Sequence, residues 1–417
     1  MDRDRSDRPA RPGKRVLWIS PKLPWPLVSG DRIRQYNLLR KLAVSHQIDL
    51  LAFAAPGEDP RPDELTSLCR RMEGLPLPAR QPWPTRVASA LHPRVPFYES
   101  RYESAPMRAA VAEAVRDRDY DVVQVEHVYM ARYFESVAAS SARRVLTMHN
   151  IESHLARRCA AVERNPAKWA YWRLEAAKLE RAERYWLRQV DTTITMSDED
   201  RYRALALAPG ATARTVENGV DTEAYQAWPC EDRESLAVFT GSLAYPPNAD
   251  GAEHLLADIW PRVRAAVPGV ACAIVGRDPS PRLRARHGRD GVTVTGPVPD
   301  VRPYLARAGV FVAPLRAGGG TRLKILEAMA SGCAVVTTTV GAEGLAVQDG
   351  RDLILADDPE SFAQATARVL QDLALRCRLG AAARQRAEER FDWRFAAAAH
   401  EVIYDRVTGN GPVRCES

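Results

Sequence analysis

The chain has 417 residues, of which 46% are hydrophobic and 27% are charged, and its formal net charge at pH 7 is +6. This length and apolar content allow two substantial cores, so we expect two or three domains. No apolar run approaches the length of a transmembrane helix, and the polar residues 1–13 lack the apolar core of a signal peptide. We therefore expect a disordered leader over residues 1–13 and a cytoplasmic protein.

Cysteine usage and net charge narrow the classes of cofactor and partner. The seven cysteines are scattered, with no C-x-x-C pair and no Cys/His cluster of zinc spacing. We expect neither a disulfide framework nor a metal, and no cofactor. The positive charge favours an anionic partner. Because no zinc finger or RNA-recognition motif is present, we expect no nucleic acid, and the phosphate of a small ligand explains the charge more economically.

The first half of the chain alternates short apolar runs with helical patterns. A buried strand is expected over residues 15–20, followed by a proline-rich loop and a helix over 31–43. Further strands are expected at 47–53, 121–126, 144–149 and 191–196, and a long helical tract at 166–188. This alternation predicts an α/β fold with a doubly wound parallel sheet.

Gly30 lies where the proline-rich loop turns into the first helix. The N-terminus of this helix is expected to point at the strand ends, where open α/β sheets bind ligands. Gly30 is therefore a candidate binding residue, with a plain turn glycine as the alternative. Arg32 and Arg34 of the same helix face either the cleft or the solvent.

Between residues 76 and 106 the alternation fails, and prolines recur among aromatic and basic residues. The aromatic residues are Trp83, Phe97, Tyr98 and Tyr102, and the basic ones are Arg80, Arg86, Arg94 and Arg101. Three interpretations of this insertion stay open: an acceptor-facing loop, a peripheral contact with the inner membrane surface, and a covering loop with solvated arginines.

Polar residues follow two of the expected strands. His149 ends the strand over 144–149, at the sheet edge where chemistry tends to occur, and a structural or solvated histidine is the alternative. The acids of residues 198–200 have the form of a metal-binding D-x-D, but they directly follow Ser197. Ser197 and Asp200 then form a capping box, and the acids complement the helix dipole. A second D-x-D, residues 117–119, lies in a polar stretch before a strand.

The second half begins a new set of strands, each ending in or near glycine. Strands are expected at 236–241, 270–276, 291–295, 310–313 and 334–337. The last part, 358–407, is mostly helical, with Asp358-Pro359 as a start signal and a break at 391–393.

The stretch 309–338 organises this half. Its strand leads into three glycines, Thr321 is a plausible helix N-cap, and helical spacing runs from Arg322 until Gly332. A strand, glycine loop, helix and strand form a βαβ unit whose free amides at the helix N-terminus bind anions. Arg322 and Lys324 place cations in the first turn, where the dipole alone favours acids. A bound phosphate explains this placement.

Glu327 lies one turn after Lys324 on the same helix face. Its side chain is expected to point towards a ligand bound at the glycine loop. The alternative is an intrahelical Lys324–Glu327 pair on a solvated face.

The run GGGTRLKILEAMASGCAVVTT, residues 318–338, resembles the donor-binding segment of the retaining glycosyltransferases of family 4, two-domain enzymes of the GT-B fold. The resemblance covers Val16 to about Val407 and is densest from Val216 to Leu355. It implies two Rossmann-like parallel-sheet domains that face a central cleft. The expected parts are an acceptor-side domain at 14–210, a linker at 211–234, a donor-nucleotide domain at 235–390 and a C-terminal helix at 391–410 that crosses back.

The resemblance also implies roles for individual residues. The donor diphosphate and sugar would be faced by Gly30, Gly318, Gly319, Gly320 and Thr321. Glu327 would hold the donor ribose, and His149 would contact the donor sugar. The nucleobase would be lined, mostly by backbone, by Gly276, Arg277 and Val298. Backbone contacts do not determine which base is bound.

The chain departs from the family pattern at two places. Eight residues before Glu327, where the family has a first glutamate, stands Gly319, so that glutamate's role has no holder here. Many relatives also supply an Arg and a Lys after the first strand of this domain, where this chain has Gly241-Ser242-Leu243 and Asn248-Ala249-Asp250-Gly251. We expect Arg322 and Lys324 to replace these cations at the diphosphate and, with His149, to be catalytic.

The resemblance therefore implies a retaining, metal-independent transfer of a sugar from a nucleotide-diphosphate sugar to a glycan, lipid-linked or small-molecule acceptor. Two other classes share the fold. One is a sugar-nucleotide epimerase or phosphorylase, and the other is a non-catalytic nucleotide-sugar-binding protein.

Overall fold

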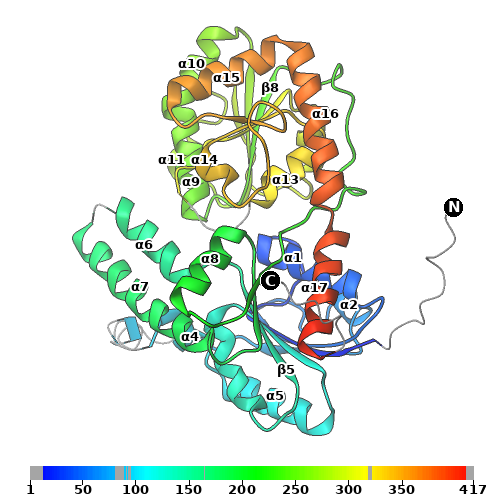
Figure 1. Cartoon of the computed structure of the whole chain (residues 1–417). Helices are drawn as coiled ribbons and strands as arrows, with labels where there is room; N and C mark the ends of the chain where they lie inside the picture. Colours follow the sequence, from blue (N-terminus) through cyan, green and yellow to red (C-terminus); the bar gives the residue numbers. More distant parts are fainter. Residues whose placement is uncertain are drawn as a thin grey trace, which may run out of the picture.

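The computed structural model describes residues 13–79, 89–90, 92, 95–163, 165–317 and 322–409. These residues form two lobes, each built on one parallel sheet that is flanked by helices (Figure 1). The α/β class and the two Rossmann-like parallel sheets expected from the sequence are confirmed. Within the described ranges, no helix is long and apolar enough to cross a bilayer.

The first sheet has the order β3-β2-β1-β4-β5-β6-β7, and its paired strands are parallel. Its strands are β1 (Arg15–Ser20), β2 (Gln47–Ala54), β3 (Arg71–Pro76), β4 (Val122–Glu126), β5 (Arg143–Met148), β6 (Thr192–Thr195) and β7 (Ala213–Thr215). The direction of winding reverses between β1 and β4. A crevice opens at such a reversal, outside the carboxyl ends of the strands.

Helices cover both faces of this sheet. They are α1 (Gly30–Leu42), α2 (Asp63–Thr66), α4 (Phe97–Arg101), α5 (Ala105–Asp117), the 3₁₀ helix η1 (Val128–Val137), α6 (Glu152–Val162), α7 (Pro166–Trp186) and α8 (Asp198–Leu207). The cap predicted for α8 is confirmed, because the Ser197 hydroxyl accepts from the Asp200 amide at 3.2 Å.

The second sheet repeats the plan with the order β10-β9-β8-β11-β12-β13 and a reversal between β8 and β11. Its strands are β8 (Leu236–Thr240), β9 (Ala271–Val275), β10 (Val292–Val294), β11 (Val310–Ala313), β12 (Val335–Thr337) and β13 (Ile354–Leu355). The central strands of both sheets are continuous apolar runs because helices bury both faces.

The helices of this lobe are α9 (Pro246–His254), the π-helical turn η2 (Leu255–Ile259), α10 (Trp260–Ala266), α11 (Pro281–Arg284), α12 (Arg302–Arg307), α13 (Leu323–Ala330), α14 (Thr339–Ala342), α15 (Pro359–Gln371) and α16 (Leu373–Arg390). Asp358 caps α15 as expected, accepting from two amides of its first turn.

The chain crosses between the lobes twice, and the two crossings lie side by side. On the outward crossing, the Val220 amide donates to the Phe391 carbonyl at 2.6 Å, and the Trp393 amide donates back to the Val220 carbonyl at 3.3 Å. A Cβ on Gly219 would lie 2.8 Å from the Trp393 ring, so only glycine fits there. After this point α17 (Trp393–Val407) packs on α1 of the first lobe (Figure 1).

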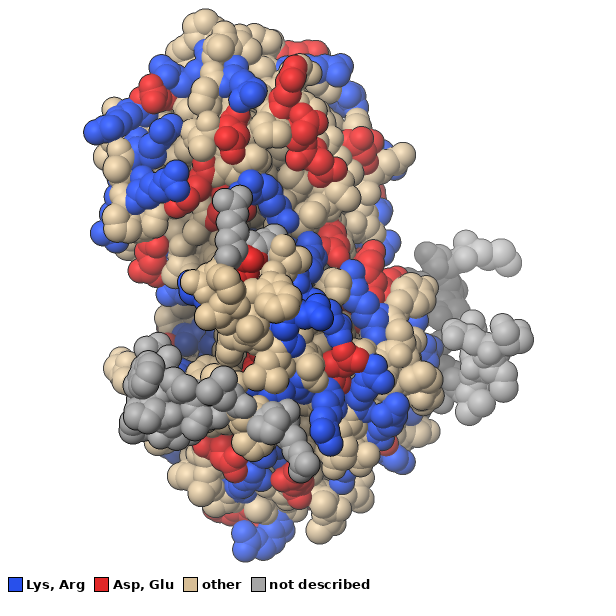
Figure 2. All heavy atoms as spheres, turned by 90° about the vertical axis from the view of Figure 1, so that its left-hand side faces the viewer, with Lys and Arg blue, Asp and Glu red and all other residues tan. Residues whose placement is uncertain are grey.

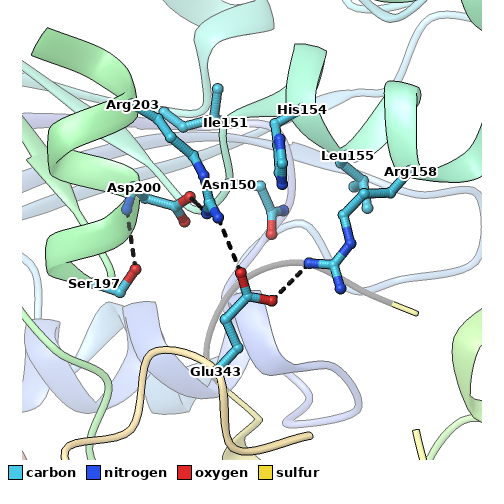
Figure 3. A pocket seen from close by; sticks show the side chains of 9 residues that line it. All are labelled: Asn150, Ile151, His154, Leu155, Arg158, Ser197, Asp200, Arg203 and Glu343. Atoms are coloured by element: carbon cyan, nitrogen blue, oxygen red, sulfur yellow. Dashed lines mark hydrogen bonds and ion pairs between the residues drawn. The ribbon is translucent and has the colours of Figure 1, made fainter. Parts of the chain in front are cut away.

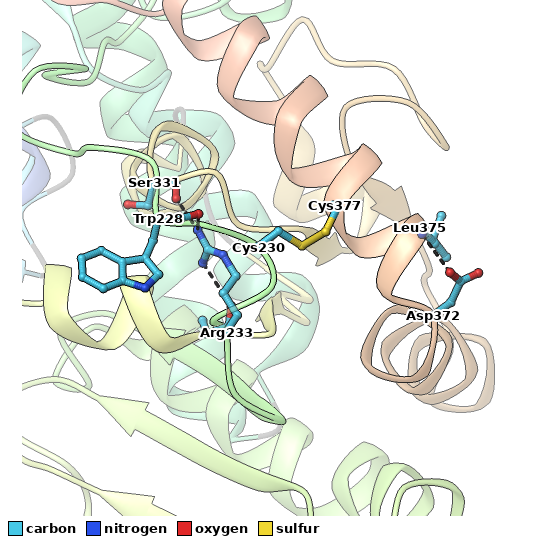
Figure 4. The surroundings of a disulfide bond; sticks show 8 residues. Trp228, Cys230, Arg233, Ser331, Asp372, Leu375 and Cys377 are labelled. Carbon is cyan, nitrogen blue, oxygen red and sulfur yellow. Dashed lines mark hydrogen bonds between the residues drawn. A yellow bond between two sulfur atoms is a disulfide. The ribbon is translucent and has the colours of Figure 1, made fainter.

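The expectation of no disulfide framework is wrong in one respect, because Cys230 and Cys377 form a disulfide (Figure 4). Their Cα atoms are 5.4 Å apart although 147 residues separate them in sequence. The bond ties the segment after the first crossing to α16. Nearby, the Arg233 guanidinium donates to the carbonyls of Trp228 and Ser331, which holds the same segment. No local spacing motif marks such a pair, so only the folded chain reveals it.

Candidate functional site

Two helix N-termini meet between the lobes. A Cβ on Gly30, the first residue of α1, would lie 3.3 Å from Cδ1 of Leu323, the first residue of α13. In Figure 1 these helices occupy the facing ends of the lobes. The first amides of each helix have no partner within the helix, and the positive end of its dipole faces this cleft. Gly30 thus lies where the two domains approach each other, and its role in binding stays a prediction.

The glycine loop of the expected phosphate site, Gly318, Gly319, Gly320 and Thr321, lies outside the described residues. The sequence had predicted that Arg322 lies in the first turn of the helix after this loop. That helix begins at Leu323, so Arg322 precedes its first turn. Arg322 is 8% exposed, and its guanidinium donates to the Val340 carbonyl at 3.3 Å. Burial lowers the pKa of Arg322, and the charge of Arg158 adds to this effect.

Lys324 is half-buried and points at the end of β8. Its Nζ donates to Asn248 Oδ1 at 2.6 Å and lies 4.5 Å from the centre of the Phe239 ring. A Cβ on Gly241 would lie 2.6 Å from this Nζ, so the ammonium stands directly beside the turn after β8. Burial, together with the smaller effect of the Arg322 charge, lowers the pKa of Lys324 to about 7. A poorly solvated cation at the cleft is suited to an anionic ligand.

Glu327 does not form the solvated pair with Lys324 that the sequence allowed as an alternative. Its carboxylate is half-buried. Burial raises the pKa of Glu327, while the nearby Tyr225 hydroxyl and the charge of Lys324 oppose the rise. Tyr225 belongs to the segment after the first crossing, and sequence reasoning had not singled it out.

The glycines expected to line the nucleobase gather at the carboxyl edge of the second sheet. Gly276 bridges to Gly296, and a Cβ on Gly276 would lie 1.8 Å from the Gly241 carbonyl oxygen. Val298 is half-buried against the core, whereas the Arg277 side chain is exposed. The structure thus brings Gly276 next to Gly241 and Lys324, and Arg277 contributes its carbonyl, which accepts from the Leu243 amide at 2.9 Å.

On the first lobe, His149 lies at the carboxyl end of β5, as expected, but it is not an isolated histidine. Its Nε2 is 2.6 Å from Glu126 Oε2, and its ring stacks on His127 with centroids 4.1 Å apart. Burial acts to raise the pKa of Glu126, but the hydrogen bond from His149 and the charges near it hold that pKa below its usual value. Neither Glu126 nor His127 was predicted, because their sequence context reads as the end of a buried strand.

The described part of the insertion at 76–106 lies beside the stacked rings of His127 and His149. Tyr102 is buried and stacks on Tyr129 with centroids 5.1 Å apart, and Tyr129 stacks on His127. Protein rings cover Tyr102, so this side chain does not take part in the membrane contact that is one of the three interpretations of the insertion. Tyr98 is 41% exposed. Trp83, Arg80, Arg86 and Arg94 lie outside the described residues.

One acid beside the cleft has a strongly shifted pKa. Glu152, at the start of α6, is half-buried, and burial raises its pKa to about 7. Asn150 donates to its carboxylate at 3.4 Å and opposes the rise. Glu152 is close enough to Tyr245 of the second lobe to affect the pKa of that phenol.

An ion-pair cluster joins the lobes at the edge of the cleft (Figure 3). Glu343, after α14, accepts from Arg158 of α6 at 2.6 Å and from Arg203 of α8 at 3.1 Å. Arg203 also pairs with Asp200 at 2.8 Å. His154 and Asn150 line the same pocket. The cluster connects the two domains only while they are close together.

Basic side chains are prominent on the surface where the two lobes meet. In Figure 2, Lys and Arg gather where the two lobes meet and on the adjoining part of the first lobe. Such a field raises the local concentration of anionic ligands and falls with ionic strength.

Comparison with known proteins agrees with this architecture. The family model "Glycosyltransferase Family 4" matches residues 28–224, and the model "Glycosyl transferases group 1" matches residues 234–372. Sucrose-phosphate synthase from Thermosynechococcus elongatus has a similar structure, with a TM-score of 0.72, 19% identity and coverage of 95% of this chain and 99% of that one. Anabaena HepE in complex with UDP and glucose gives a TM-score of 0.68 at 15% identity, covering 94% of this chain and all of that one.

The fold and the facing sheet edges thus define a two-domain protein of the GT-B type. Its two halves match the family 4 and group 1 models of the glycosyltransferases, which supports a GT-B glycosyltransferase of the family 4 type. The chain is 33% identical over 214 residues to the phosphatidyl-myo-inositol mannosyltransferase of Mycolicibacterium smegmatis. The aligned region covers 49% of this chain and 54% of that protein. It is 36% identical over 136 residues to the D-inositol 3-phosphate glycosyltransferase of Nocardioides, 30% of each chain. The chain spans about half the length of the first of these relatives.

The cluster around Glu343 predicts a salt-dependent contact between the lobes. Glu343→Gln removes the charge that both arginines share, and we expect a loss of about 1 kcal/mol of closing energy, since all three side chains are partly exposed. Small-angle X-ray scattering at low salt should then give a larger radius of gyration than for the wild type, and high salt should reduce the difference. Glu234→Gln is the matched control, because Glu234 pairs with Arg307 inside the second lobe. Coincident scattering curves for Glu343→Gln and wild type at low salt would contradict the prediction.

Proposed function

We propose that this protein transfers a sugar from a nucleotide-diphosphate sugar to a hydroxyl group of an acceptor. The observation that carries the proposal is the meeting of the N-termini of α1 and α13, with Arg322 and Lys324 beside them. Two positive helix ends and two poorly solvated cations in one cleft favour a multiply charged anion. A donor diphosphate has that charge.

The second lobe would bind the donor. Lys324 lies beside Gly241 and Asn248. These two residues belong to the segments in which many relatives carry an Arg and a Lys for the diphosphate. This position supports the idea that Lys324 replaces those cations. Arg322 is the second cation in our proposal, and its burial directly before the first turn of α13 supports this role.

The nucleoside would lie against the sheet edge behind these cations. We propose that Glu327, oriented by Tyr225, binds the ribose hydroxyls, since a carboxylate accepts from two neighbouring hydroxyls. The base would rest on Gly276, the carbonyl of Arg277 and Val298. The absence of side chains at Gly241 and Gly276 lets the backbone approach a ligand closely.

In the reaction, the bond between the anomeric carbon and the diphosphate oxygen breaks, and the diphosphate leaves with the electron pair. The new bond forms to the acceptor oxygen, in our proposal on the same face of the sugar, so that the configuration is retained. The proton of the acceptor hydroxyl passes to the departing diphosphate. Charge builds up on the diphosphate, where Arg322, Lys324 and the helix amides would stabilise it. His149 would hold the sugar from the first lobe, which would also bind the acceptor.

We propose further that transfer needs no divalent metal. The acids of the D-x-D at 198–200 have protein partners. Asp198 accepts from Thr215 at 2.7 Å and from Arg201 at 3.0 Å, and Asp200 pairs with Arg203. A metal would have to displace these partners. The cations of the cleft are proposed to supply the positive charge in its place.

The acceptor is the least defined part of the proposal. A glycan, a lipid-linked acceptor or a small molecule all fit a hydroxyl nucleophile, and two relatives are named for inositol-bearing substrates. Inositol-bearing lipids therefore belong in the acceptor panel. Peripheral membrane contact through the insertion stays a prediction, since Arg101 is the only one of its four expected arginines in the described residues.

A two-stage experiment tests the function. Thermal unfolding is first measured with a panel of nucleoside diphosphates, since a ligand at a hundred times its Kd adds about 2.7 kcal/mol of stability. Transfer from the matching sugar donors is then measured with and without a chelator, and the anomer of the product is determined. Activity that needs added Mg²⁺ would contradict the metal-free proposal. Nucleotide binding with neither transfer nor donor hydrolysis would indicate a nucleotide-sugar-binding protein.

The cations predict a specific kinetic defect. Charge develops on the leaving diphosphate, so Arg322→Ala and Lys324→Ala should each lower kcat. Each substitution should raise the activation free energy by about 2 to 4 kcal/mol, with a smaller effect on donor affinity. Arg316→Ala is the matched control, since Arg316 also follows β11 but pairs with Asp250 on the surface. Glu327→Gln should weaken nucleoside and nucleoside diphosphate binding alike. Near-wild-type kcat in both cation variants, in folded protein, would move the phosphate site elsewhere.

Lys324 predicts a pH dependence of nucleotide binding. In the free protein its pKa is about 7, so the ammonium loses its proton as the pH rises above 7. A bound diphosphate favours the charged form and raises the pKa, so binding takes up a proton in this range. The Kd should therefore rise between pH 7 and 9, by up to about tenfold per pH unit. Calorimetry in two buffers of different ionisation enthalpy measures the proton uptake. Lys324→Gln should show weaker binding without this slope, and a flat wild-type profile would refute the assignment.

A further inference from the structure

A chain of buried hydrogen bonds connects the last helix of the protein to His149. The Tyr404 hydroxyl of α17 donates to Gln124 Oε1 at 2.5 Å, and Gln124 Nε2 donates to Glu126 Oε1 at 2.7 Å. The other oxygen of Glu126 is 2.6 Å from His149 Nε2. We call Tyr404, Gln124 and Glu126 the relay. None of its side chains is more than 1% exposed.

Each member of the relay has a defined orientation. Gln124 uses its carbonyl for Tyr404 and its amide group for Glu126 and for the Thr147 hydroxyl at 3.1 Å, so a flipped amide would lose these bonds. Glu126 is a buried anion, because the bond from His149 and the Gln124 amide, with the nearby charge of Arg34, hold its pKa below the usual value despite burial. A carboxylate without a proton can only accept.

This direction of hydrogen bonding determines the tautomer of His149. Since Glu126 accepts, His149 Nε2 must carry the proton, and Nδ1 of the neutral ring is then left as an acceptor. An acceptor nitrogen is complementary to a sugar hydroxyl. A donor at Glu126's position would permit the opposite tautomer and present an N–H to the sugar.

His127 holds the plane of the same ring. The two imidazoles stack with 10° between their planes, and neither ring nitrogen of His127 has a hydrogen-bond partner among the described residues. His127 therefore contributes its face and not its polar edge. Its φ of 70° is unusual for a residue other than glycine, and such backbone persists only where the surroundings enforce it. His149 is thus constrained at one edge by Glu126 and on one face by His127.

We propose that Glu126 is a positioning residue for transfer, and that Tyr404 of α17 keeps it in place through Gln124. The proposal rests on the proposed role of His149 at the donor sugar. It gives α17 a function beyond bracing the first lobe. Because α17 follows directly from α16 of the second lobe, the helix that joins the lobes also supports the sugar-binding histidine.

The main test is Glu126→Gln, which keeps the size of the side chain but can donate to His149 as well as accept. We expect kcat for transfer to fall by about tenfold to a hundredfold, by analogy with the loss of the carboxylate that orients a metal-bound histidine. The Kd for nucleoside diphosphate should not change, since the second lobe binds the nucleotide. In the His149→Ala background, Glu126→Gln should have no further effect on kcat.

Two tyrosine variants separate the relay from general stability. Tyr404→Phe and Tyr133→Phe each remove one buried hydroxyl that donates at 2.5 Å, Tyr133 to the Tyr102 carbonyl. Both should lower the melting temperature to a similar extent. Only Tyr404→Phe should lower kcat, by about fivefold, as for one lost hydrogen bond. Equal kcat in the two variants would remove Tyr404 from the proposal.

A readout without activity keeps the inference apart from the proposed function. In protein labelled with ¹⁵N-histidine, the His149 signals should show a proton on Nε2 in the wild type and a loss of this state in Glu126→Gln. An Nδ1-protonated His149 in the wild type would overturn the proposal, as would unchanged kcat in Glu126→Gln. If no donor supports transfer but the spectra agree, the proposed function fails while the relay geometry stands.

Discussion

The structure depends on an electrostatic conflict between two positive helix ends. The N-termini of α1 and α13 meet at Gly30 and Leu323, and Arg322 and Lys324 add charge at the same place. Such an arrangement is costly without a counter-anion, because partly buried cations lose hydration. Asp31 in the first turn of α1 does not resolve it, because Lys22 pairs with that carboxylate at 2.9 Å. A ligand that brings negative charge would relieve this conflict.

The two lobes can respond to such a ligand because few connections join them. The crossings pair at Val220 and Phe391, and at the opposite side of the cleft Glu343 contacts two arginines of the first lobe. The crossings pair through backbone bonds, which survive small rotations, whereas the ion pairs are partly exposed and weak. An anion that draws the helix ends together would therefore compete with modest forces.

On the first lobe, the side chain of His149 is held rigidly by its neighbours, whereas on the second lobe Arg322 and Lys324 contribute positive charge. His149 is held by a buried carboxylate and a stacked ring, and the carboxylate is held in turn from α17. Buried networks of this kind are stable only when each member is satisfied, so they define one arrangement of the polar groups. The last helix therefore links the packing of the first lobe to the position of a side chain in the cleft.

The sequence by itself determined the elements and the class of the protein. Apolar runs such as Val310–Ala313 and capping signals such as Ser197 and Asp358 are local, and local patterns predict strands and helix starts. The edge strands β3, β7 and β13 were missed because they are short or less apolar. Only the tertiary structure decided which distant residues meet: Cys230 with Cys377, Glu343 with Arg158, and Tyr404 with Gln124. These contacts arise when the parallel sheets and the returning helix bring together segments that are far apart in sequence, and no local spacing encodes them.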